Sequence, residues 1–264
     1  MVKEFKDKNQ WAVILGGSSG LGLASAKKLA SHGMNLIILH RDRKTNLAAI
    51  EREFEVCKKE GIQLKSFNID ATNSEKIQEN LSEIKSLLSD KGKIKILLHS
   101  IAKGNLKPML GEKTTLSSVD FQITIQAMAL SLYDWVKAIF TEELFHQDSR
   151  IIAFTSEGNS KAWKNYAAVS AAKVALEAIT RNIALEFAAY GIKANCIQAG
   201  MTDTFSFRQI SGSEQLKKYA LMRNPNQRLT TAEDVANVVY LLSKDEAKWI
   251  TGTTIPVDGG EHLS

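Results

Sequence analysis

The sequence is poor in cysteine, in proline and in clustered metal-binding residues, and each shortage excludes a class of protein. Its two cysteines, Cys57 and Cys196, cannot form the disulfide framework of a small secreted domain. These cysteines and five scattered histidines also lack the close spacing of a metal site, so we expect no metal and two reduced thiols. None of the three prolines lies where it would divide the chain. We therefore expect one domain.

The chain also has no run of about 18 apolar residues, the length that a helix needs to cross a membrane. Its opening stretch, MVKEFKDKNQ, is charged and lacks the apolar segment of a secretory signal. We therefore expect a cytoplasmic protein. The net charge of +5 is spread along the chain without a basic stripe, which argues against nucleic-acid binding but suits an anionic ligand.

The sequence does contain a regular alternation of short apolar segments with amphipathic stretches. Seven segments are typical of β-strands: Trp11–Leu15, Asn35–Leu39, Gln63–Asn68, Lys95–His99, Arg150–Thr155, Lys193–Ala199 and Thr253–Val257. Strands that alternate with helices form parallel sheets, so we expect a Rossmann-type, doubly wound α/β fold of about seven strands. Only residues 200–228 break the alternation, and we interpret them as an irregular substrate lid on a single domain of residues 1–264.

A glycine-rich stretch, LGGSSGLG, joins the first predicted strand to the predicted helix Leu23–Ser31. Glycine allows the backbone to turn sharply and to approach a pyrophosphate closely, and the helix N-terminus offers free N–H groups to the phosphates. The spacing of Gly16, Gly20 and Gly22 resembles the dinucleotide-binding loop of short-chain dehydrogenase/reductases, although Leu15 replaces the threonine usual in that superfamily. A glycine-rich turn without a ligand is the alternative.

The residues after the second predicted strand indicate which dinucleotide binds. His40 occupies the expected strand tip, where an acidic residue would favour NADH, and Arg41 and Arg43 lie beside it. Because guanidinium groups pair well with phosphate, we expect NADPH. Asp42 leaves NADH open, because a shift of the strand end by one residue would place a carboxylate near the ribose.

The catalytic residues follow from one tyrosine and one lysine. Tyr166 lies seven residues before Lys173, which is about two helical turns, so both side chains can face one pocket. Most superfamily members place the tyrosine four residues before the lysine, where this chain has Val169. The longer spacing resembles that of the enoyl-acyl-carrier-protein reductases.

Other stretches strengthen this resemblance, which extends over nearly the whole chain. The run from His99 to Ala102 is similar to one in enoyl reductases, and residues 199–204 and 257–260 resemble the family's nicotinamide-side segment and C-terminal turn. Ser156 stands where many enoyl reductases have a second tyrosine, as in the NADPH-dependent type III enzymes. Gln126 replaces the helix asparagine that assists a proton relay in carbonyl-reducing members.

The resemblance implies NADPH-dependent reduction of an enoyl thioester in fatty-acid synthesis, with Tyr166, Lys173 and Ser156 as catalytic residues. It implies that Lys173 holds the nicotinamide ribose and lowers the pKa of Tyr166, and that Asp70 lies beside the adenine. We expect the following cofactor contacts: Gly16, Ser18, Ser19, Gly20, Leu21, Gly22, Arg41, Arg43, Asp70, Ser100, Ile101, Ala102, Lys173, Gly200, Thr202 and Thr204.

The resemblance further implies a homo-oligomer, a tetramer or a dimer, and a substrate carried by acyl carrier protein. Apolar lid residues could line an acyl slot or pack the lid onto the body: Phe205, Phe207, Ile210, Leu216, Tyr219, Leu221 and Met222. Four basic lid residues could bind an acidic carrier or form a solvated face: Arg208, Lys217, Lys218 and Arg223. A 3-oxoacyl-thioester or other carbonyl reductase, and a non-catalytic dinucleotide-binding regulator, are the competing hypotheses.

Overall fold

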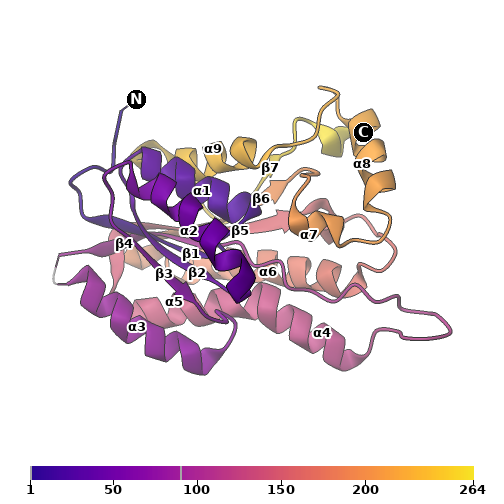
Figure 1. Cartoon of the computed structure of the whole chain (residues 1–264), viewed down its shortest axis with the longest axis horizontal. Helices are drawn as coiled ribbons and strands as arrows, with labels where there is room; N and C mark the ends of the chain where they lie inside the picture. The colour runs from indigo at the N-terminus through magenta and orange to yellow at the C-terminus, as the bar shows by residue number, and fades with distance from the viewer. Residues whose placement is uncertain (1, 90) are drawn as a thin grey trace.

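The computed structural model of the chain describes residues 2–89 and 91–264, which fold around a parallel β-sheet (Figure 1). The strands are β1 (Gln10–Leu15), β2 (Asn35–His40), β3 (Leu64–Asn68), β4 (Lys93–His99), β5 (Phe145–Ser156), β6 (Ile192–Ala199) and β7 (Thr254–Val257). Their order is β3-β2-β1-β4-β5-β6-β7, and all neighbouring pairs are parallel. The predicted doubly wound sheet is therefore confirmed, and each of the seven predicted segments is a strand.

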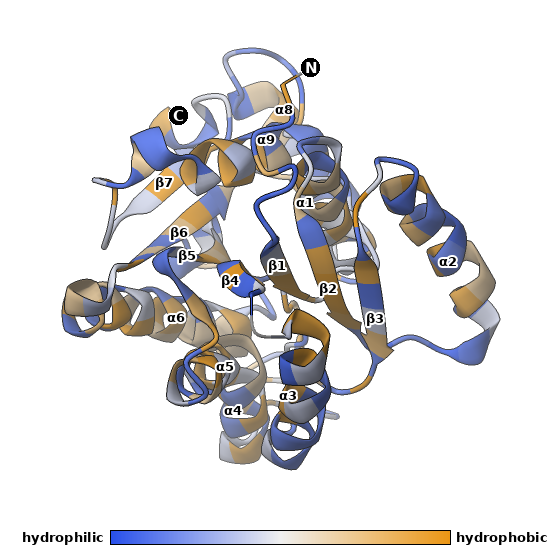
Figure 2. Cartoon of the chain, turned by 90° about the vertical axis from the view of Figure 1, so that its left-hand side faces the viewer, coloured by the Kyte–Doolittle hydropathy of each residue, from blue (hydrophilic) through white to orange (hydrophobic). Residues whose placement is uncertain are grey.

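Helices cover both faces of this sheet (Figure 2). One face packs against α3 (Ser74–Leu88), α5 (Ser131–Thr141) and α6 (Ala167–Glu186), and the other against α1 (Gly20–Ser31), α2 (Lys44–Lys58) and α9 (Ala232–Ser243). The helix α4 (Ser118–Ile125) continues into α5 through a π-helical turn, Gln126–Leu130. No helix in the described ranges is long and apolar enough to cross a membrane.

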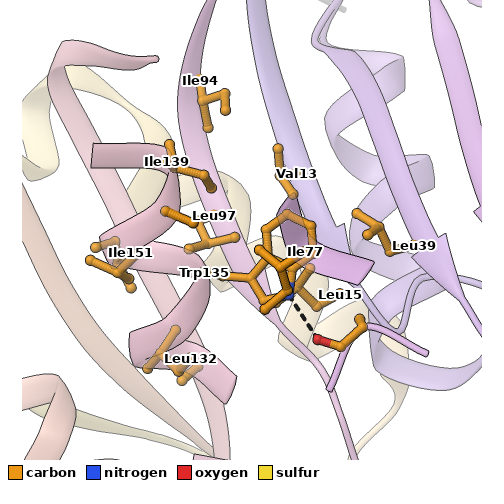
Figure 3. Packing of buried hydrophobic residues seen from close by; sticks show 14 of the residues in the cluster. Val13, Leu15, Leu39, Ile77, Ile94, Leu97, Leu132, Trp135, Ile139 and Ile151 are labelled. Atoms are coloured by element: carbon orange, nitrogen blue, oxygen red, sulfur yellow. Dashed lines mark hydrogen bonds between the residues drawn. The ribbon is translucent and has the colours of Figure 1, made fainter. Parts of the chain in front are cut away.

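The alternation of side chains along each strand divides the core into two layers. In β1, Val13 and Leu15 join the layer of α3, α5 and α6, whereas Ala12 and Ile14 join the opposite layer. Trp135 fills the centre of the first layer, and its indole N–H donates to the Ala71 carbonyl at 2.9 Å (Figure 3). This bond holds α5 to the segment that follows β3 at the carboxyl edge of the sheet.

Two predictions need correction. The strand β5 begins at Phe145, which pairs with Ile94 of β4, while Ser149 pairs with Ile192 of β6. The lid is helical rather than irregular, since it contains α7 (Phe205–Arg208) and α8 (Ser213–Arg223). In Figure 1 both helices lie beyond the carboxyl ends of β5 and β6. Cys57 and Cys196 are buried and unpaired in the described structure, and burial raises the pKa of each thiol to about 11.

Candidate active site

A cleft of about 590 Å³ lies at the carboxyl edge of the sheet. The strand order reverses its direction between β1 and β4, and the loops after these two strands diverge there. Residues from both loops line the cleft, together with residues that follow β2, β3, β5 and β6. The topology therefore creates a ligand site at the place where open α/β sheets usually have one.

The glycine-rich loop forms one wall of this cleft, and its shape depends on glycine. At Gly16 the φ angle is +86°, and a Cβ atom there would come within 2.6 Å of the Ser100 carbonyl oxygen. The N-cap of α1, Ser19, makes no side-chain capping bond, so the N-terminus of α1 keeps its N–H groups for a ligand. The loop therefore fits a dinucleotide pyrophosphate.

Most of the predicted cofactor contacts face the cleft. The lining residues among them are Gly16, Ser18, Ser19, Gly20, Leu21, Arg41, Asp70, Ser100, Ile101, Ala102, Lys173, Gly200, Thr202 and Thr204. Gly22 does not line the cleft, because it packs α1 against the loop, where a Cβ atom would collide with the Gly16 carbonyl. Arg43 does not line it either, since it is the N-cap of α2. For Gly22 and Arg43, contact with the cofactor stays a prediction.

Arg41 and Lys103 both contact the Asp70 carboxylate on the side of the cleft near β2 and β3. Arg41 Nη1 lies 2.8 Å and Lys103 Nζ 3.1 Å from Asp70 Oδ2. Burial opposes the ionised form of Asp70, but hydrogen bonds from Thr72 and Lys103 hold the carboxyl pKa well below its usual range. Two cations therefore line this end of the cleft, and sequence reasoning missed Lys103 because only the fold places it beside Asp70.

Asp42 also lines this end of the cleft, but its carboxylate is already engaged. His40 Nδ1 lies 2.9 Å from Asp42 Oδ2, and the Asp42 backbone N–H donates to Asn68 Oδ1, also at 2.9 Å. Since His40 is buried at the strand end, the aspartate is held against the sheet. Asp42, the residue that left NADH binding as an alternative, thus has a hydrogen-bond partner within the protein.

Tyr166, Ser156 and Lys173 line the same cleft, as the sequence predicts. The Tyr166 and Ser156 hydroxyl oxygens are 3.3 Å apart. Lys173 is buried and donates from Nζ to the Phe154 carbonyl oxygen at 2.6 Å. Tyr166 is the N-cap of α6 and so precedes the helix, yet it still shares the cleft with Lys173 two turns later.

With this geometry established, comparison with known proteins identifies the family. The family model described as enoyl-(acyl carrier protein) reductase matches residues 16–262. The chain belongs to this family of short-chain dehydrogenase/reductases. The enzyme is therefore an oxidoreductase.

Its relatives include enzymes that reduce different bonds. It is 28% identical over 257 residues to a 3-oxoacyl-[acyl-carrier-protein] reductase of Staphylococcus epidermidis, covering 97% of this chain and 100% of the relative. It is 30% identical over 192 residues to the enoyl-[acyl-carrier-protein] reductase [NADH] of Aquifex aeolicus, covering 71% and 69%. A crystal structure of the Aquifex aeolicus enzyme superposes with a TM-score of 0.83 at 26% identity, covering 98% of each chain.

Burial shifts the pKa values of the reductase's two predicted catalytic groups in opposite directions. Burial raises the pKa of the Tyr166 phenol, and the hydrogen bond with Ser156 offsets part of this rise. Burial lowers the pKa of Lys173 to about 8. The prediction that Lys173 lowers the pKa of Tyr166 is wrong in this structure, where burial dominates. At neutral pH the phenol therefore keeps its proton and can donate it.

Two residues that sequence reasoning missed fix the position of the Tyr166 ring. The Trp163 ring lies beside it, with centroids 5.0 Å apart. Gly158 lies against the ring edge, where a Cβ atom would collide with Tyr166 Cε1. Position 158 requires glycine because the Tyr166 ring packs against it in the folded protein. No pattern of residue spacing in the sequence could have shown this requirement.

Behind the cleft, His99 and Gln126 are each held by a side chain that does not line it. His99 is fully buried, its Nε2 lies 2.9 Å from the Ser131 hydroxyl, and burial followed by the Lys173 charge lowers its pKa to about 3. The ring is therefore neutral. Gln126 lies on the π-helical turn, donates to Asp134 at 3.0 Å and does not line the cleft.

The lid covers the cleft with only part of its apolar surface. Phe205, Phe207 and Ile210 line the cleft. The other four predicted lid residues do not: Leu216, Tyr219, Leu221 and Met222. Met222 is 83% exposed, so it takes neither of the two alternatives left open by the sequence, whereas the three cleft-lining residues are placed to line an acyl slot.

The predicted basic face of the lid is largely engaged within the protein. Arg208 and Lys217 both bind Asp203, at 2.7 and 2.9 Å. Arg223 is buried, with its guanidinium on Glu157 and Glu261. The structure thus leaves only Lys218 of the four without an ion-pair partner among the described residues.

Proposed function

We propose that this enzyme reduces the carbon–carbon double bond of enoyl thioesters with NADPH. The observation that carries the proposal is the displaced tyrosine. Tyr166 and Lys173 line one cleft, and the tyrosine position of most superfamily members is occupied by Val169, which lines the same cleft without a hydroxyl. The site thus has its phenol about one helical turn from the place usual in carbonyl reductases.

Gln126 gives independent support. Carbonyl reduction ends with a proton on the substrate oxygen, and the helix asparagine of the superfamily assists its delivery. Here the equivalent amide is bound to Asp134 outside the cleft. Enoyl reduction also consumes one proton, which the enolate takes up at its α-carbon. We propose that this proton comes from solvent through the cleft and not through this helix, while Tyr166 donates a hydrogen bond to the enolate oxygen.

The chemistry assigns a role to each side chain. When bound, the nicotinamide supplies a hydride to the β-carbon of the enoyl thioester. Negative charge then develops on the thioester oxygen, and the protonated Tyr166 phenol donates a hydrogen bond to that oxygen. Because this charge forms only near the transition state, the bond stabilises the transition state more than the substrate.

Ser156 and Lys173 support the phenol and the cofactor. The Ser156 hydroxyl fixes the orientation of the Tyr166 hydroxyl, 3.3 Å away. The Lys173 ammonium, anchored on the Phe154 carbonyl, has hydrogen-bond donors left for the nicotinamide ribose hydroxyls.

NADPH is favoured by the charges near β2. Arg41 and Lys103 supply two cations, while Asp42 is held by His40 and is poorly available to a ribose hydroxyl. We expect Arg41→Ala to raise the KM for NADPH by about tenfold or more while changing that for NADH little, since a charge-assisted phosphate contact contributes about 1.5–3 kcal/mol. A wild-type enzyme that prefers NADH would refute the proposed cofactor.

The substrate class is tested by parallel assays of NADPH oxidation with crotonyl and acetoacetyl thioesters. Turnover of the crotonyl thioester alone supports enoyl reduction. Turnover of the acetoacetyl thioester alone makes the enzyme a carbonyl reductase, as its similarity to the Staphylococcus epidermidis enzyme would then suggest. Dinucleotide binding without any turnover would favour a regulator.

We also propose that acyl carrier protein delivers the substrate in fatty-acid synthesis and that the enzyme acts as a homo-oligomer, a tetramer or a dimer, in the cytoplasm. Because the basic lid residues are mostly paired internally, charge reversal at Lys218 should change the KM for a carrier-bound substrate only slightly. Light scattering of the purified protein tests the oligomer, and a monomeric mass at assay concentration would refute it.

A further inference from the structure

Arg223, the last residue of α8, forms a buried ion cluster at the edge of the cleft. Its guanidinium bonds both Glu157 oxygens, at 3.0 and 2.7 Å, and one Glu261 oxygen at 2.8 Å. The three side chains are 7%, 12% and 4% exposed. Both carboxylates line the cleft.

This cluster connects the beginning of the lid with the end of its second helix, α8. The second Glu261 oxygen accepts a hydrogen bond from the Met201 backbone N–H at 3.1 Å, where the lid begins. The first Glu261 oxygen binds Arg223, where α8 ends. One carboxylate of the C-terminal turn therefore holds both ends of residues 201–223.

The cluster also reaches the catalytic residues. Glu157 follows Ser156 directly, so the guanidinium that ends the lid is bound to the turn that carries the hydroxyl partner of Tyr166. The same turn includes Gly158, against which the Tyr166 ring packs. Displacement of α8 would therefore pull on the two residues that orient the phenol.

Energetics suggest a role beyond stability. Two carboxylates and one guanidinium are removed from water here, and the half-exposed Lys161 adds positive charge on Glu157. Buried ion clusters of this kind commonly stabilise a fold less than apolar residues of similar volume would. Their geometry, in contrast, is specific, because the fork of arginine fixes direction as well as distance.

We propose that Glu157, Arg223 and Glu261 form a latch that holds the lid closed and sets the Ser156–Tyr166 pair for catalysis. Arg223 is a positioning residue that acts through Glu157. Only the kinetic part of the test rests on the proposed function.

The test uses the whole chain in three latch variants and one control. Arg223→Met breaks the latch but leaves Glu261 without its arginine and Glu157 with Lys161 alone, a loss that endangers folding. The triple variant Glu157→Gln/Arg223→Met/Glu261→Gln removes the charges together and avoids that penalty. Lys65→Met is the control, because Lys65 forms an exposed ion pair with Glu83 outside both the lid and the active-site cleft.

We expect amide hydrogen exchange over residues 205–223 to accelerate by about tenfold or more in the triple variant, with the central strands unchanged. We expect kcat to fall by about tenfold and KM to change less, because the phenol loses its alignment. Arg223→Lys should restore only part of kcat, since an ammonium cannot reproduce the fork. The control should match the wild type in both measurements.

Lid exchange at the wild-type rate in the triple variant would overturn the latch, and so would faster exchange spread evenly over the whole fold. Loosening of the lid with unchanged kcat would overturn the coupling to Tyr166. If the wild type turned over no enoyl or keto thioester, the proposed function would fail, and hydrogen exchange would still decide whether the latch closes the lid.

Discussion

The two ends of the sheet both bury basic side chains, but they provide different partners. At the amino end, Lys95 lies 2.8 Å from the Asp148 carboxylate, and Arg150 binds the same carboxylate at 2.6 and 3.0 Å. Lys193 adds a third cation at 2.8 Å. At the carboxyl end, Lys173 has no ion-pair partner within residues 2–89 and 91–264 and reaches a carbonyl oxygen instead.

This difference separates stability from chemistry. A buried charge with a fixed partner is held in one protonation state and one position, which suits a structural role at Asp148 and a positioning role at Arg223. A buried charge without such a partner has a shifted pKa and hydrogen-bond donors left for a ligand, and such groups gather at functional sites. The predictions below test this division, from the largest expected effect to the smallest.

Asp148→Ala tests the amino end. It removes the carboxylate that Lys95, Arg150 and Lys193 share and leaves Lys95 with the exposed Asp245 at 3.3 Å, so we expect the free energy of unfolding to fall by about 3–5 kcal/mol in urea titrations. The kcat and KM of the folded fraction should stay unchanged. A stable variant, or a folded variant with impaired turnover, would remove the contrast between the two ends.

The same carboxylate gives a pH dependence of known sign. Burial opposes ionisation of Asp148, but its bonds to Arg150, Lys193 and Lys95 hold its pKa below the unfolded value of 3.8. Its contribution is therefore complete above about pH 4 and is lost as the pH falls toward the folded pKa. Asp148→Asn should show a weaker loss of stability below pH 4 than the wild type.

Tyr166→Phe tests the carboxyl end. Removal of the phenol hydroxyl should lower kcat for an enoyl thioester by about 100- to 1000-fold, as expected for a lost donor to a developing oxyanion. Stability and dinucleotide affinity should change little. Tyr190→Phe, which alters an exposed ring elsewhere, is the control. Near-normal turnover by Tyr166→Phe would exclude the phenol from the reaction.

The contrast between the two ends also marks what the sequence can predict. Strand segments and the glycine-rich loop are local patterns of apolar spacing and backbone freedom, so they were predictable. The ion cluster at Asp148 was not, because its partners lie on three different strands. Polar residues 146–149, which include Asp148, also concealed the start of β5.

Within the site, the seven-residue spacing predicted that Tyr166 and Lys173 share a cleft, and they do, although Tyr166 precedes α6. The sequence did not distinguish Arg41, which lines the cleft, from Arg43, which does not. The contacts of Gly158 and Lys103 depend on segments that meet only after folding. The sequence could not decide which apolar lid residues face the cleft, because a short helix buries only one face and the pattern does not show which.

The charge of Lys173 provides a further test of the carboxyl end. Because burial lowers its pKa to about 8, the side chain loses its proton as the pH rises through that value. We expect kcat/KM to fall above about pH 8 as the cofactor loses a cationic partner. Lys173→Arg should abolish this break, since guanidinium stays charged. Lys95→Arg, at the other end of the sheet, should keep it; a break that follows Lys95 would contradict the assignment.

The smallest effect is expected at Gln126, which belongs to neither group. Its amide is bound to Asp134 outside the cleft, so Gln126→Ala should change kcat for an enoyl thioester by less than about twofold, in the range of ordinary surface substitutions. Gln126→Asn, which restores the superfamily residue, should likewise confer no acetoacetyl-thioester reduction, because the missing element for that reaction is also the phenol displaced from position 169. A large loss in either variant would mean that this helix supplies protons to the site after all, and would favour carbonyl reduction.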